Sequence, residues 1–184
     1  MTDRDLVELA QQGDRDAFGV LARTKADGLF AVAHRILRDF GRAEDAVQQT
    51  LVIAWRELPT LRDPDRFEAW MRRLLVRICY VESTRARRWA ANVRVLPADA
   101  AVANDELDWF ADRDLLERGF ARLPSDQRAI LVLHHYLGLA PGEIAATLGI
   151  PAGTARSRLH YAHRAMRAAL EADERRAAVA GRRP

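Results

Sequence analysis

The 184-residue chain is 49% hydrophobic and 30% charged, which is typical of a soluble globular protein with one medium domain or two small ones. No apolar run approaches the roughly 18 residues that a membrane-spanning helix needs, and the polar, acidic start MTDRDLVELA does not resemble a secretory signal. Cys79 is the single cysteine, so an intramolecular disulfide is excluded and a small buried apolar residue is the favoured interpretation. These features predict a cytoplasmic protein without membrane insertion.

The net charge is only +3, but the charges are unevenly distributed along the chain. Arginines gather between residues 62 and 94, acidic residues between 99 and 117, and the last thirty residues are basic again. Two basic blocks separated by an acidic block predict two nucleic-acid contacts joined by a connector that does not bind nucleic acid.

Apolar residues recur at helical spacing along the first half and predict helices over 3–12, 14–38, 42–58 and from 64 onward. Thr2 or Asp3 can cap the first of these helices, and Asp63 followed by Pro64 can start the fourth. The third helix keeps a polar outer face that includes Gln48. A solvated surface is the favoured interpretation of that face, and a docking surface for a basic partner is the alternative.

The fourth predicted helix interleaves aromatic residues with arginines. Its aromatic residues are Trp70, Tyr80 and Trp89. This composition is typical of a single-strand binding platform, where bases stack on rings and guanidinium groups hold phosphates. A core position is favoured for Trp70, whereas the arginines at the end of the helix are favoured as DNA contacts.

The helical periodicity decays after about residue 91, where the sequence VLPADAAVANDE is small, acidic and interrupted by proline. This composition predicts a linker. Helical patterns resume near Asp112 and again after Pro124, while the last residues have little apolar content and predict a flexible tail. No strand pattern of useful length is present, so the chain is predicted to be all-α.

Residues 140–166 show the pattern of a helix-turn-helix. Two runs with a single apolar face are separated by Gly149-Ile150-Pro151, and the second run directs hydroxyl groups, a tyrosine and arginines outward. Such a helix can reach phosphates and base edges in a major groove, although any surface helical hairpin also has one polar face. Ala140 stands where a Ser or Thr cap is expected, which costs about 1 kcal/mol of stability at the helix start.

The sequence offers little for catalysis. His160 and His163 are three residues apart on a predicted helix, but no cysteine or carboxylate joins them at the spacing of metal ligands. A glycine-rich phosphate loop and a plausible Ser/His/Asp set are also missing from the sequence. We therefore predict no metal, no cofactor and no enzymatic activity.

Three motifs together resemble the sigma-70 family, specifically its small two-domain extracytoplasmic-function (ECF) group. They are AEDAVQQTLVIAW at 43–55, RFEAWMRRL at 66–74 and LPSDQRAILVLHHYLGLAPGEIAATLGIPAGTARSRLHYAHRAMRAAL at 123–170. The resemblance implies two helical domains joined by an acidic linker. The implied segments are sigma region 2 at 1–90, the linker at 91–111, the region 4 helix-turn-helix at 112–172, and the flexible tail at 173–184.

The resemblance assigns roles to three sets of residues. The set expected to contact RNA polymerase is Asp45, Gln48, Gln49 and Thr50. The set expected to read the −35 element is Thr154, Arg156, Ser157, Arg158, Tyr161 and Arg164. The set expected at the −10 element is Trp70, Arg73, Arg77, Tyr80, Arg85, Arg87 and Arg88. Arg77 and Val81 stand near positions where many members carry Asn and Asp, which affects the expected −10 base preference.

The implied function is a transcription initiation factor that directs core RNA polymerase to promoter DNA and aids promoter opening. The implied contacts on polymerase are the clamp coiled coil of the largest subunit and the flap, and members of this group are often held inactive by an anti-sigma protein. A stand-alone helix-turn-helix regulator is the alternative, and it would leave the patterns at 43–55 and 66–88 unexplained. A helical scaffolding protein would need no basic recognition face.

Overall fold

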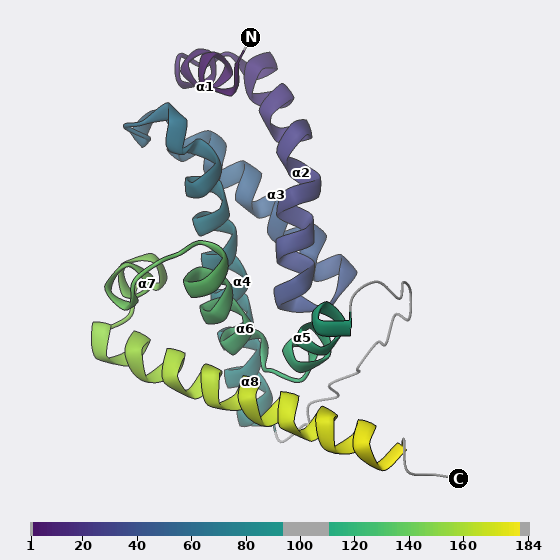
Figure 1. Ribbon diagram of the computed structural model, residues 1–184. Helices are drawn as coiled ribbons and strands as arrows, with labels where there is room; N and C mark the ends of the chain where they lie inside the picture. The colour runs from purple at the N-terminus through teal and green to yellow at the C-terminus, as the bar shows by residue number, and fades with distance from the viewer. Residues whose placement is uncertain (1, 94–110, 181–184) are drawn as a thin grey trace.

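The computed structural model describes residues 2–93 and 111–180, and all of its regular elements in these ranges are helical (Figure 1). The all-α prediction is confirmed. The first half contains α1 (Asp3–Gln11), α2 (Arg15–Leu37), α3 (Phe40–Glu57) and α4 (Phe67–Val93), with short 3₁₀ turns η1 (Leu58–Thr60) and η2 (Pro64–Arg66). The second half contains α5 (Ala111–Ala121), α6 (Ser125–Leu131), the π-helical turn η3 (Val132–Tyr136), α7 (Pro141–Leu148) and α8 (Ala152–Ala180).

Helices α1, α2 and α3 begin at side chains that accept hydrogen bonds from free backbone N–H groups. The Thr2 hydroxyl accepts from Asp5 N at 3.2 Å, and the Asp14 carboxylate caps α2. Asp39 accepts from Arg42 N at 2.8 Å, so α3 begins two residues before the predicted start at 42. Arg38 links α2 to α3 in the left-handed conformation, at φ 53°.

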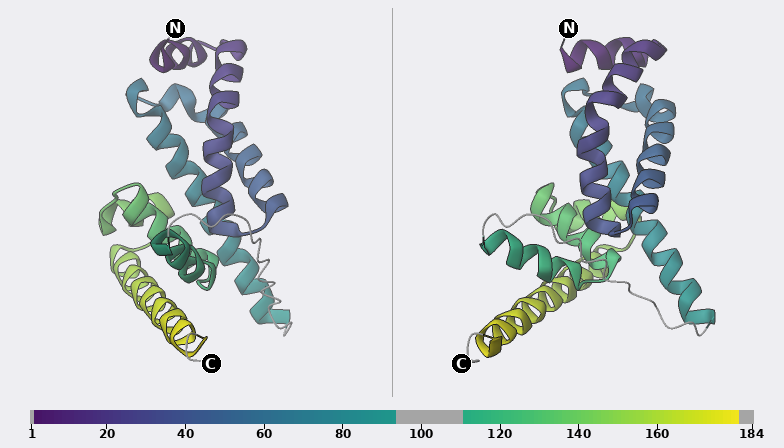
Figure 2. Two further views of the ribbon diagram at one scale, coloured as in Figure 1. Left: turned by 45° about the vertical axis from the view of Figure 1, so that its right-hand side comes forward. Right: turned by 90° about the vertical axis from the view of Figure 1, so that its right-hand side faces the viewer.

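Helices α2, α3 and α4 run side by side, and α1 lies across one end of this bundle (Figures 1 and 2). Their core includes the fully buried Leu21, Ile36, Met71 and Leu75. Gln11 Nε2 donates to the carbonyl oxygens of Leu58 and Leu61 at 3.1 and 2.7 Å, which attaches the end of α1 to η1. The bundle thus places one face of α3 and the length of α4 at the surface.

In the second half, α7 and α8 form the predicted helix-turn-helix and pack with α6, while α5 lies along α8. Gly149 ends α7 at φ 65°, a left-handed conformation that disfavours residues with a side chain. Without a hydroxyl at Ala140, only half of the usual capping pair forms, with Ala140 N donating to Glu143 Oε2 at 2.8 Å. A Cβ on Gly119 would lie 2.9 Å from Leu170 Cδ2, so this glycine allows α5 and α8 to approach closely.

The last described segment of the chain is helical. Helix α8 continues to Ala180, and the buried Asp173 pairs with Arg122 at the end of α5. Residues 173–180 are helical in the structure, and the ion pair of Asp173 holds the start of this segment beside the end of α5, while the flexible tail from 173 stays a prediction. The predicted linker lies mostly outside the described residues, between the end of α4 and the start of α5.

The two halves are packed against each other, with α6 next to α2 and α4. The central contact is the buried Arg128, which is 6% exposed. Its Nε donates to the Ile36 carbonyl of α2 at 2.5 Å, and its Nη1 donates to the Leu123 carbonyl at 2.5 Å. Arg35 and Glu117 form an ion pair at 2.5 Å beside it. Within the described ranges, no helix is both long enough and apolar enough to cross a lipid bilayer.

Candidate polymerase and promoter interfaces

Helix α3 exposes the polar face that the sequence predicted, with one exception. Asp45, Gln48 and Gln49 are exposed, whereas Thr50 is completely buried. The Thr50 hydroxyl donates to the Ala46 carbonyl at 2.7 Å, so its hydrogen-bonding group is satisfied inside the bundle. Thr50 is therefore not accessible on the exposed face of α3 in this structure, and its contact with polymerase stays a prediction.

An apolar residue on the same face was missed by the sequence reasoning. Val52 lies one turn after Gln48 and its side chain is 54% exposed. The sequence did hold a signal for its exposure, because position 52 falls outside the helical spacing of the apolar residues that α3 buries. Polar side chains around an exposed valine form a surface on which a partner could bury apolar area, which a purely solvated face does not offer.

The recognition face of α8 follows the predicted helical spacing. Its buried side is made of Ala155, Leu159 and Ala162, which pack into the second half. The opposite side carries the candidate −35 residues, and the exposed members are Arg156, Ser157, Tyr161 and Arg164. Thr154 and Arg158 are half-buried. Thr154, Ser157, Tyr161 and Arg164 share the side opposite the core, with Arg156 and Arg158 on its two flanks, a set that can contact phosphates and base edges.

The candidate −10 residues on α4 fall into two groups. Arg77, Arg85 and Arg87 are exposed, Arg73 is half-buried, and Arg88 lies outside the described side chains. The aromatic members are less accessible: Tyr80 is 3% exposed, and Trp70 packs against the core with its ring 6.1 Å from that of Phe67. The predicted stacking platform is therefore not open in this arrangement, because the second half covers Tyr80 and the bundle holds Trp70.

Contacts between the halves bring the candidate −10 and −35 residues together. The Arg158 guanidinium lies over the Tyr80 ring at 5.6 Å from its centroid, and Arg87 pairs with Asp126 at 2.5 Å. A groove of about 510 Å³ between α4, α6 and α8 is lined by Arg87 and Asp126 and, on α8, by Arg158 and Tyr161. Because the two sets face each other across the groove, they cannot lie on two separate DNA elements in this arrangement.

The polar contacts in this groove are incompletely satisfied. Within the described chain, the buried Tyr80 hydroxyl, Asp126 Oδ1 and Gln127 Oε1 have no hydrogen-bond partner. Buried polar atoms without partners reduce the stability of the interface that contains them. These three atoms therefore weaken the contact between the halves.

Cys79 occupies the core of the first half and has no part in these surfaces. Its side chain is completely buried, and this burial raises the pKa of the thiol to about 12. The sequence interpretation of Cys79 as a buried apolar residue is confirmed.

Comparisons with known proteins cover both halves of the chain. The family model described as Sigma-70 region 2 matches residues 21–89, and that described as Sigma-70, region 4 matches residues 113–168. The ECF RNA polymerase sigma factor SigL of Mycobacterium tuberculosis is 34% identical over 146 residues, which are 78% of this chain and 82% of the relative. This chain belongs to the ECF group of the sigma-70 family. In this sigma factor, region 2 thus corresponds to the α2–α4 bundle and region 4 to the helices from α5 to α8.

Further relatives agree with this assignment. The RNA polymerase sigma-E factor of Streptomyces avermitilis is 32% identical over 158 residues, with 84% of this chain and 85% of the relative covered. The structure of CnrH in complex with the cytosolic domain of CnrY matches with a TM-score of 0.52 and 27% identity, covering 93% of this sigma factor and 98% of CnrH. The fold also matches sigma factor RpoE in complex with the anti-sigma factor NepR from Bartonella quintana, with a TM-score of 0.59, 24% identity and coverage of 85% and 98%.

Proposed function

We propose that this sigma factor binds core RNA polymerase through the exposed face of α3 and directs it to promoters with −35 and −10 elements. Helix α8 enters the major groove of the −35 element, and the arginines of α4 hold the non-template strand of the −10 element. The presence of region 2 and region 4 in one chain, in that order, is the observation that carries this proposal. A stand-alone helix-turn-helix regulator would not account for region 2.

The proposed mechanism uses binding energy alone and has no covalent step. Capturing exposed bases contributes about 1–3 kcal/mol per stacked base, which shifts the equilibrium of the duplex toward the open form. Polymerase fixes the spacing of the two sigma regions, so the −35 contact raises the effective concentration of the −10 contact. The phosphate contacts of the arginines make this binding steeply dependent on salt.

The proposal requires the two halves to separate. Tyr80 and Arg158 contact each other in this structure, and each must leave the other before it can contact DNA. The proposed site of action is the cytoplasm, where polymerase and promoter DNA are found. An anti-sigma protein that covered the α3 face or held the halves together would keep the factor inactive.

The test is reconstitution with sigma-free core polymerase and a library of promoter fragments, followed by mapping of transcript starts. We expect starts that share one −35 and one −10 element. Replacing both Gln48 and Gln49 with alanine should weaken binding to core polymerase, while the control Gln12→Ala, an exposed glutamine beyond α1, should not.

Promoter contact is tested separately. Arg164→Ala should reduce transcription from promoters with an intact −35 element, whereas Arg175→Ala, about three turns further along α8, should change it little. A protein that fails to bind core polymerase, starts no transcripts and yet shifts duplex DNA alone would overturn the proposal in favour of the stand-alone regulator.

A further inference from the structure

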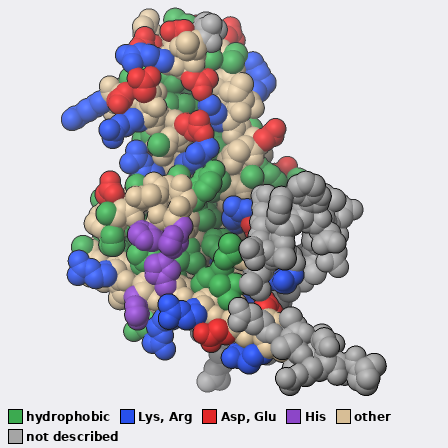
Figure 3. Space-filling view, in the orientation of Figure 1, with side chains coloured by type: hydrophobic (Ala, Val, Ile, Leu, Met, Phe, Trp, Pro, Cys, Tyr) green, Lys and Arg blue, Asp and Glu red, His purple; other side chains and the backbone are tan. Residues whose placement is uncertain are grey.

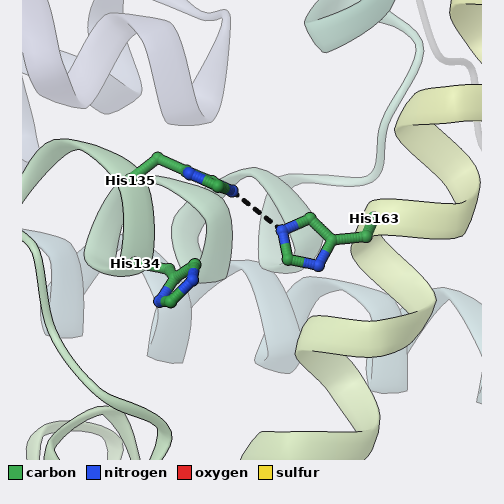
Figure 4. Close-up of side chains that lie close together, drawn as sticks. All are labelled: His134, His135 and His163. Carbon is green, nitrogen blue, oxygen red and sulfur yellow. Dashed lines mark hydrogen bonds between the residues drawn. The ribbon is translucent and has the colours of Figure 1, made fainter.

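Three histidines from two elements gather on the surface of region 4. His134 and His135 lie on the π-helical turn η3, and His163 lies on α8, on the face of the molecule where Figure 3 shows histidine side chains side by side. Each offers a ring nitrogen, and these three atoms lie within 4.8 Å of one another. Figure 4 shows the rings directed toward the space between η3 and α8. The sequence pairs His163 with His160, but the fold brings it to η3 instead.

The hydrogen bonds of the cluster leave ring lone pairs available. His134 Nδ1 lies 2.9 Å from the Leu139 carbonyl oxygen, which can only accept a hydrogen bond. His134 Nδ1 is therefore the donor, and in the neutral ring Nε2 keeps a lone pair. A backbone carbonyl that orients a histidine in this way is the usual support of a metal ligand.

The other two rings meet directly. His135 Nε2 and His163 Nε2 are 2.8 Å apart, so at least one of the two rings must be neutral to accept the hydrogen bond. Burial, followed by repulsion from neighbouring histidines, lowers the pKa of both rings, and Arg167 adds to this effect at His163. Neutral imidazole is the form that binds metal ions.

We propose that His134, His135 and His163 bind one divalent transition-metal ion, with Zn²⁺ as the ion argued for and water completing a tetrahedral site. Imidazole nitrogens bind Zn²⁺ at about 2.0–2.1 Å, which places two ligand nitrogens about 3.3 Å apart. Compared with the 2.8 Å between the two Nε2 atoms, the pair must open by about 0.5 Å. Rotation of the exposed His135 and His163 side chains can supply this movement.

The site would link two elements that local sequence does not connect. Residue 163 is adjacent to Arg164 and two residues after Tyr161 on the recognition helix, while η3 precedes α7. Metal binding would attach α8 to η3 and stabilise region 4, by an amount that grows with the logarithm of the ion concentration above the Kd. A π-helical turn that carries two of the three ligands agrees with the frequent placement of such turns at functional sites. This inference does not depend on the promoter contacts proposed above.

The experiment uses the full chain without a histidine tag, after treatment with a chelator. Zn²⁺ is titrated in competition with a chromophoric chelator, and Co²⁺ is titrated separately because its absorption reports ligand type and geometry. We expect one equivalent of each ion to bind and the Co²⁺ spectrum to be tetrahedral. His135→Asn and His163→Asn should each lower affinity at least tenfold, by analogy with the losses that even supporting residues of a metal site produce.

His160→Asn is the matched control, because His160 is also on α8 and its ring lies beside Tyr161, outside the cluster. It should bind as the original chain does. Circular dichroism of the metal-free variants tests that they are folded, and Zn²⁺ should raise the melting temperature of the original chain and His160→Asn only. Equal loss of affinity in His160→Asn, or unchanged affinity in His163→Asn, would overturn the proposal, as would failure to bind one equivalent of either ion.

Discussion

Replacing Arg128 with methionine tests whether a buried cation stabilises this fold. Methionine keeps most of the length and the apolar part of the side chain but removes the guanidinium group. In the structure this group donates to Ile36 O and Leu123 O, both at 2.5 Å, and to Ser125 Oγ at 3.1 Å. Ile36 is in the last turn of α2, where backbone carbonyls lack partners within the helix and the helix dipole favours a cation.

We expect the variant to lose about 3 kcal/mol of unfolding free energy. A hydrogen bond to a charged group contributes about 1.5–3 kcal/mol, and each buried carbonyl left without its donor costs about 1–3 kcal/mol. Removing the cost of burying a charge offsets part of this sum. Arg156→Met is the control, because Arg156 is exposed on α8 and its replacement should change stability by less than about 0.5 kcal/mol.

The measurement is urea unfolding of the full chain, followed by circular dichroism and by tryptophan fluorescence. A midpoint shift with an unchanged slope would report a change in stability alone. If the two signals report one transition in the original chain and two separate transitions in the Arg128 variant, the bond to Ile36 couples the unfolding of the two halves. A loss below about 1 kcal/mol, indistinguishable from the control, would refute the role assigned to Arg128.

Three further predictions follow from burial and protonation. Cys79 should resist alkylation in the folded protein and react after unfolding, because burial raises the pKa of its thiol to about 12; rapid labelling at neutral pH without denaturant would contradict its core position. The pKa of His135 and of His163 is lowered in the folded state, so protonation favours unfolding. The stability contributed by these rings should be complete above the usual pKa of 6.5 and should fall as the pH drops below it. Thermal melts of the metal-free protein across this range should show a melting temperature that depends less steeply on pH in His163→Asn. Thr50→Val should change stability but leave binding to core polymerase intact, whereas replacing Gln48 and Gln49 together should do the reverse; equal effects on binding would restore Thr50 to the contact surface.

The sequence alone determined the local structure of this protein. Helical spacing located all the main helices, Asp14 and Asp63 marked starts, and Gly149 marked the turn between α7 and α8. The family motifs in the sequence assigned the first half to sigma region 2 and the second half to region 4. The interpretation of Cys79 as a core residue was also correct. These features depend on residues a few positions apart, whose relation is set by the geometry of a single helix.

The contacts between distant segments were decided only by the tertiary structure. Tyr80 is covered by Arg158, and Arg128 reaches a carbonyl 92 residues away. The histidine cluster arises in the same way, because His135 and His163 are 28 residues apart and meet only when α8 packs beside η3. Such contacts depend on how whole helices pack, and periodicity within one helix carries no information about which side chains of another helix it will meet.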